Sequence, residues 1–120
     1  MTKRRNAVVA VISAAVLALT GFVSVSAASA ASVQVGVILP DAASSARWET
    51  ADRKFLAAAF KAAKVTADIQ NANGDKAKFA TIADQMLAKG VKVLIMAGLD
   101  SPSTAAIQAK AKKQGVKTID

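Results

Sequence analysis

Residues 33–48, with the sequence VQVGVILPDAASSARW, decide the fold of this chain. The apolar residues of 33–39 form a nearly continuous run, which is typical of a strand buried on both faces of a parallel sheet. The run ends at Pro40, a polar loop follows, and Arg47 and Trp48 then begin an amphipathic helix. Ligands of open parallel sheets bind at the carboxyl ends of the strands. The arginine and the tryptophan therefore form a candidate binding surface.

Strands and helices alternate from this first strand to the end of the chain. Hydrophobic spacing predicts these elements in chain order: strand 33–39, helix 46–63, strand 65–70, helix 76–89, strand 91–97, helix 102–114, and a strand from Val116. The alternation predicts an α/β fold, a parallel sheet with helices on both faces. Right-handed crossovers would place the three strand-to-helix loops along one edge of the sheet.

Capping residues and apolar stripes define the expected helices. Ser44 or Ser45 is expected to cap the first helix, and Ser101 to cap the third, with Pro102 at its first position. Gly90 is expected to end the second helix in a left-handed conformation. The first helix should bury Trp48, Ala51, Phe55, Ala58, Ala59 and Ala62, and the second should bury Phe79, Ile82, Ala83, Met86 and Leu87.

Residues 1–30 have the pattern of a secretory signal peptide, which leaves residues 31–120 as the exported domain. Three basic residues precede the apolar segment 7–19, and Ala28-Ser29-Ala30 forms a small-residue cleavage site. The alternative is an uncleaved membrane anchor, because the apolar segment can be extended to residue 25. The first interpretation predicts a protein exported to the periplasm or the exterior of the cell envelope.

Charge and composition exclude several classes of function. The chain has a net charge of +8, but three of the positive charges lie in the signal, and the remaining lysines are spread along helices without interleaved aromatic residues. Solvated helix faces explain them better than a nucleic-acid partner does. The sequence contains no His, Cys or Tyr, which excludes zinc sites of the usual type and His-dependent nucleophile systems within this chain. No GxGxxG loop follows the first strand, and no cofactor is expected.

The last strand stops at Asp120, soon after it begins. A parallel sheet of three or four strands would expose an edge and leave part of one face uncovered. We therefore expect a fragment of a longer protein. The alternative is a naturally short domain with a swapped or dimeric edge.

Three stretches resemble the periplasmic sugar-binding proteins of ABC importers, and most of all the xylose- and multiple-monosaccharide-binding group. They are VGVILPDAASSARWETADR, QNANGDKAKFATIADQMLAKGVKVLIM and AKKQGVKTID, in this order and without large gaps. The resemblance implies a type I periplasmic-binding-protein fold with two α/β lobes. This chain would then be a signal peptide and the first half of the N-terminal lobe, and it would not bind sugar alone.

The resemblance also implies a ligand site. Its arginine–tryptophan pair matches Arg47 and Trp48: a guanidinium can donate paired hydrogen bonds to a sugar, and an indole can pack against a pyranose. Further candidates in the same loop and after the third strand are Asp41, Ser44, Ser45 and Asp100. Trp48 could instead be a core anchor. Arg47 could be a solvated residue of the first helical turn or pair with Glu49 or Asp41, and Asp100 could simply cap the loop before Pro102. The family's Asp-Arg ligand pair would follow residue 120 and is not in this sequence.

Lys64 departs from the family pattern, in which glycine usually ends the first helix. The resemblance predicts a monomeric solute receptor without catalytic activity, which binds a xylose-like monosaccharide and docks on an ABC permease. The alternatives are a membrane-anchored sugar-sensing domain of a signalling protein and an exported α/β enzyme. A sugar-responsive repressor conflicts with the export signal.

Overall fold

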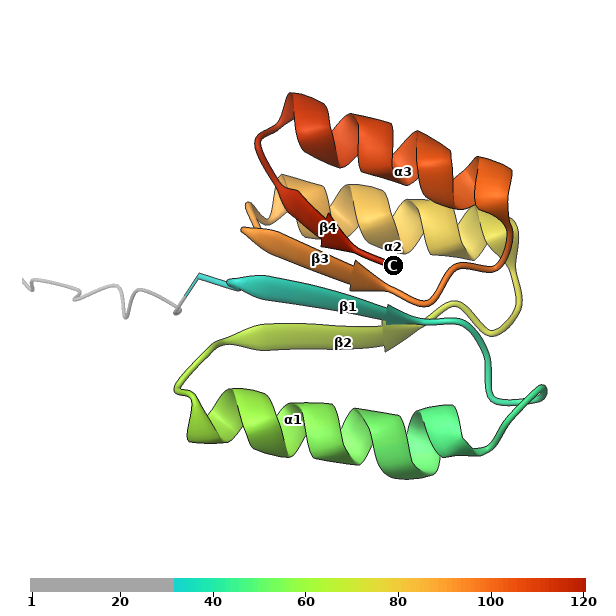
Figure 1. Cartoon of the computed structure of the whole chain (residues 1–120), viewed down its shortest axis with the longest axis vertical. Helices are drawn as coiled ribbons and strands as arrows, with labels where there is room; N and C mark the ends of the chain where they lie inside the picture. The colour runs from blue at the N-terminus through green and yellow to red at the C-terminus, as the bar shows by residue number, and fades with distance from the viewer. Residues whose placement is uncertain (1–31) are drawn as a thin grey trace, which may run out of the picture.

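A computed structural model describes residues 32–120, which form one parallel sheet with helices on both sides (Figure 1). The predicted signal peptide and the alternative anchor lie outside the described residues. None of the described helices is both long enough and apolar enough to span a membrane. The elements are β1 (Val35–Leu39), η1 (Trp48–Asp52), α1 (Arg53–Ala62), β2 (Ala67–Asn71), α2 (Lys76–Ala88), β3 (Val93–Met96), α3 (Ser101–Lys113) and β4 (Lys117–Ile119).

The sheet has the strand order β2-β1-β3-β4, and every neighbouring pair is parallel. The crossover from β1 to β2 runs in one direction along the sheet, and the crossovers to β3 and β4 run in the other. Right-handed connections therefore place α1 on one side of the sheet and α2 and α3 on the other, as Figure 1 shows. The predicted α/β fold class is confirmed, and the strands begin about two residues later than expected because pairing starts only at Val35 and its partners.

The side of the sheet that faces α2 and α3 holds a tightly packed core. Ile38 and Leu94 of the central strands meet Phe79 and Met86 of α2, and all four side chains are fully buried. Gly36 lies on the same face, where an added Cβ would come within 2.5 Å of the sulfur of Met86. The predicted buried stripe of α2 is confirmed in full.

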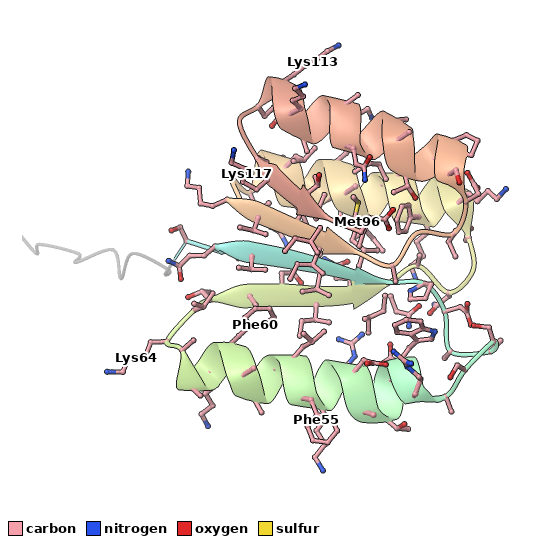
Figure 2. The ribbon with its side chains drawn as sticks, in the orientation of Figure 1. Phe55, Phe60, Lys64, Met96, Lys113 and Lys117 are labelled. Atoms are coloured by element: carbon pink, nitrogen blue, oxygen red, sulfur yellow. The ribbon has the colours of Figure 1, made fainter. Side chains whose placement is uncertain are left out.

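The predicted stripe of α1 is wrong. Neither η1 nor α1 contains a fully buried residue, and Phe55 is 67% exposed. Figure 2 shows Phe55 pointing away from the sheet and Phe60 pointing toward it. Leu56 and Phe60 are half-buried, whereas the alanines at positions 58, 59 and 62 are exposed. Alanines lie on every side of this helix, so the larger residues, and not the alanine spacing, determine which side packs.

The helix starts also differ from the prediction. Neither Ser44 nor Ser45 caps the first helix, because the helical turn begins only at Trp48, without a side-chain cap. Asp100, not Ser101, caps α3, and its carboxylate accepts the backbone N–H of Ser103. Pro102 therefore occupies the second helical position.

The helix ends agree better with the sequence. Gly90 and Gly115 follow α2 and α3 with φ angles of 77° and 72°. Lys64 takes the equivalent place after α1 with a φ of 56°, in the left-handed region that favours glycine. Lys64, which stands where the family pattern has glycine, therefore adopts a backbone conformation that is unfavourable for a residue with a side chain.

Candidate functional site

The loops that leave β1, β2 and β3 lie together at the carboxyl edge of the sheet (Figure 1). The backbone connects the first two of them: the N–H of Ala72 donates to the carbonyl of Leu39, and the N–H of Gly74 donates to the carbonyl of Pro40, both at 2.9 Å. The third loop joins through the N–H of Ala97, which donates to the carbonyl of Ile38. The edge therefore presents one continuous surface.

The chain enters α1 through η1, a single turn of π-helix. The amide of Trp48 donates to the carbonyl of Ser45, and the amide of Arg53 donates to the carbonyl of Trp48, five residues earlier. Turns of π-helix are uncommon and occur often at functional sites. The wider turn starts the helix at the tryptophan, directly at the edge of the sheet.

Arg47 and Trp48 form a stacked pair at this edge. The guanidinium carbon lies 4.6 Å from the centre of the indole ring, a cation–π distance. Asp52 holds the same guanidinium: its Oδ2 accepts from Nε at 2.8 Å and its Oδ1 accepts from Nη2 at 3.4 Å. The arginine side chain is still 63% exposed. It pairs with neither Glu49 nor Asp41, the two partners that the sequence had suggested.

Asp41 and Ser44 are occupied with each other. The carboxylate of Asp41 accepts the backbone N–H of Ser44 at 2.5 Å and its hydroxyl at 2.8 Å. These hydrogen bonds, with that of the backbone N–H the strongest, hold the pKa of Asp41 below its usual value. The two residues shape the loop, and Ser45 contributes its carbonyl to the start of η1.

Asp100 connects the starts of two helices. One oxygen caps α3 through Ser103, and the other lies 2.8 Å from Nζ of Lys76, the first residue of α2, as an ion pair without a well-directed hydrogen bond. The ammonium of Lys76 has the largest effect on the pKa of Asp100, and the Ser103 amide has the next largest. Together they lower this pKa to about 2. Both carboxylate oxygens have partners within the chain, which is the arrangement of a helix cap.

A polar cluster that was not predicted from the sequence lies beside the arginine–tryptophan pair. Glu49 accepts two hydrogen bonds from Arg53 and a third from Asn71 at the end of β2. Arg53 and, to a smaller extent, Asn71 lower the pKa of Glu49. The i, i+4 spacing of Glu49 and Arg53 could have suggested the ion pair. Asn71 also shapes the turn after β2, since its Oδ1 accepts the N–H of Asn73.

The position of the hollow and the absence of a metal-ligand cluster among residues 32–120 narrow the chemistry of this edge. A hollow of about 560 Å³ lies between α3 and β4, but none of the predicted site residues lines it. Within residues 32–120, no group of three His, Cys, Asp or Glu side chains is placed to hold a metal ion. The groups present at this edge are a planar cation, an aromatic ring and hydrogen-bonding side chains. Such groups suit the recognition of a neutral polar molecule.

Solved structures with this fold include two proteins that bind glucose. A carbohydrate transporter solute-binding protein from Chloroflexus aurantiacus, in complex with D-glucose, is 32% identical with a TM-score of 0.62, over 69% of this chain and 24% of that one. An ABC transporter solute-binding protein from Clostridium phytofermentans, with bound β-D-glucose, is 29% identical with a TM-score of 0.66, over 72% and 26%.

A third structure supports the fold alone. An ABC transporter solute-binding protein from Mycobacterium smegmatis, with bound glycerol, is 21% identical with a TM-score of 0.66, over 72% of this chain and 30% of that one. A search of the curated proteins finds no match. This chain spans only about a quarter of the length of the solved glucose-binding proteins. The periplasmic binding protein domain matches residues 35–120, and the chain belongs to this family.

Proposed function

We propose that this chain is the first part of the N-terminal lobe of a solute-binding protein of an ABC importer. The protein would bind a monosaccharide such as xylose or glucose without catalysis and would deliver it to a membrane permease. The family match, and the bound glucose of two relatives, support the ligand class. The observation that carries the proposal is the stacking of Arg47 on Trp48, 4.6 Å apart, at the carboxyl edge of the sheet.

This pair has the two chemical features that a sugar site needs. The guanidinium of Arg47 covers one face of the indole, and the other face would pack against the C–H face of a pyranose. Asp52 engages Nε and Nη2 of Arg47, whereas Nη1 has no protein partner in the described part of the chain and can donate to hydroxyl oxygens. Asp52 also balances the charge of the guanidinium, which favours a neutral ligand over an anion.

The other candidate residues have supporting roles in the proposal. Asp41, Ser44 and Ser45 would add polar contacts from the loop that precedes the pair, and Asp100 would add one from the loop after β3. A second lobe would close over the sugar by a hinge motion, and the closed form would dock on the permease as a monomer. Residues 1–30 would act as the signal peptide that exports the protein to the periplasm.

The test is sugar binding by the two-lobed protein that begins with this chain. Isothermal titration with glucose, xylose, galactose and arabinose should reveal a saturable site. Arg47→Ala and Trp48→Ala should each weaken the affinity by more than about 1 kcal/mol, the scale of a charged hydrogen bond or an aromatic contact. Matched controls on the outer side of α1 are Lys54→Ala and Phe55→Ala, whose side chains are exposed.

The four variants separate the outcomes. Both controls should bind as tightly as the wild type. Equal affinity of all four variants and the wild type would move the site away from Arg47 and Trp48. If none of the four sugars gives a saturable site, the sugar-binding proposal is rejected and the alternative of an exported enzyme is favoured.

A further inference from the structure

The π-helical turn that carries Trp48 is attached to the sheet by polar side chains. Glu49, the residue after the tryptophan, accepts from Arg53 through Nε at 2.5 Å and through Nη2 at 3.0 Å. Glu49 also accepts from Nδ2 of Asn71 at 2.6 Å. Arg53 in turn donates from Nη1 to the carbonyl of Ile69 at 2.6 Å. The cluster thus connects the start of the helix to two points on β2.

Apolar packing does little to fix this turn. No residue of η1 is fully buried, Trp48 is half-buried, and the half-buried large apolar residues of α1, Leu56 and Phe60, lie at least one helical turn beyond Asp52. The side chains of Glu49 and Arg53 are themselves only 35% and 34% exposed, so solvent reaches the cluster partially. Charge-assisted hydrogen bonds are therefore the strong contacts that hold the turn in place.

The sheet end of the cluster is held by backbone pairing and by a side-chain hydrogen bond. Asn71 is the last residue of β2 and pairs with Leu39 of the central strand. Its side-chain oxygen accepts the N–H of Asn73, which fixes the amide so that its nitrogen points to Glu49. Because both the oxygen and the nitrogen of the Asn71 amide are hydrogen-bonded, this side chain can fix the position of Glu49.

We infer that Glu49 is a positioning residue, which holds the turn of Arg47 and Trp48 against the end of β2 so that the stacked pair is formed before a ligand arrives. The ligand part of this inference rests on the proposed function, but the positioning itself does not. A pre-formed pair loses less conformational entropy on binding, and small displacements of contact groups are costly.

The fluorescence of Trp48 tests the positioning directly, because it is the only tryptophan of the chain. In the 120-residue chain, Glu49→Ala should increase acrylamide quenching and shift the emission to longer wavelength. Asp84→Ala is the control, since it also removes a carboxylate that pairs with a basic side chain, Lys110, but on a more exposed surface. The control should leave both fluorescence readings at their wild-type values.

Two milder variants keep the test valid if the alanine variant unfolds. Glu49→Gln retains an acceptor oxygen and should give quenching between the wild type and Glu49→Ala. Asn71→Ala should increase quenching as well, and its effect should shrink when Glu49 is already replaced, because the two side chains act through one contact. Wild-type quenching in both Glu49→Gln and Asn71→Ala would overturn the inference.

Sugar affinity then tests the consequence for binding. In the two-lobed protein, Glu49→Ala should weaken affinity by about tenfold, equivalent to about 1.4 kcal/mol. Unchanged affinity in this variant, combined with weaker binding by Trp48→Ala, would overturn the role of Glu49 in binding. Unchanged affinity in Trp48→Ala would instead remove Trp48 from the sugar site, absence of any saturable sugar binding would reject the proposed function, and the fluorescence result would still decide the positioning.

Discussion

The two sides of the sheet are built in different ways. On the side of α2 and α3, large side chains such as Phe79, Met86 and Ile107 are sealed from solvent. On the side of α1, no residue of the helix is fully buried, and charged groups reach into the contact with β2. The first side provides the stability of the fold. The second keeps polar and aromatic groups accessible at the edge where a ligand would bind.

The largest expected effect separates two phenylalanines on opposite sides. Phe79→Ala should lower the free energy of unfolding by about 3–5 kcal/mol, because it leaves a cavity in a fully buried site. Phe55→Ala should change it by no more than about 0.5 kcal/mol, because the ring is already in water. Urea unfolding followed by circular dichroism measures both. Similar losses in the two variants would contradict the difference between the two sides.

Gly36 offers a second test of the packed side. Gly36→Ala should cost about 1–3 kcal/mol, since the new methyl group would lie 2.5 Å from the sulfur of Met86 and 3.1 Å from a methyl group of Leu94. Met86→Ala removes the closest of these obstacles. In urea unfolding, the double variant should therefore lose less stability than the sum of the two single variants, and simple additivity would show that the helix moves to make room.

The packed side could be predicted from sequence because its apolar residues are large and regularly spaced. The orientation of α2 against the sheet is fixed by the spacing of Phe79, Ile82 and Met86, which fits only one orientation. The first helix is rich in alanine, so its apolar spacing fits several orientations, and the wrong one was predicted. The tertiary structure resolves this ambiguity, because Leu56 and Phe60 are half-buried and Phe60 points toward the sheet (Figure 2).

The candidate site, like the fold, could be predicted only in part from the sequence. The adjacency of Arg47 and Trp48 and their place after β1 follow from the sequence. The contact of Glu49 with Asn71 does not, because it joins residues 22 positions apart through the parallel pairing of β1 and β2. The pairing of Arg47 with Asp52 was also missed, since it spans the unusual π-helical turn.

The end of α1 gives a smaller, stabilising effect. Lys64→Gly should raise the free energy of unfolding by about 0.5–1 kcal/mol, because it relieves a left-handed conformation in a residue with a side chain. Gly90→Ala, at the end of α2, should lower it by about 1 kcal/mol for the same reason. Urea midpoints measure both changes. A loss of stability in Lys64→Gly would mean that Lys64 makes a favourable interaction that outweighs the strain.

The smallest effect concerns acid, and it belongs to the packed side, where Asp100 joins α2 and α3. Lys76 and the amide of Ser103 lower the pKa of this carboxyl from 3.8 to about 2 in the folded protein. Its contribution to stability is therefore complete above about pH 4 and is lost as the pH falls toward 2. Asp100→Asn removes the titrating group, so its urea midpoint should fall less steeply than that of the wild type between pH 4 and 2. Lys76→Ala should have an intermediate slope, because the Ser103 amide remains, and a wild-type slope in Asp100→Asn would assign the acid sensitivity to other carboxylates.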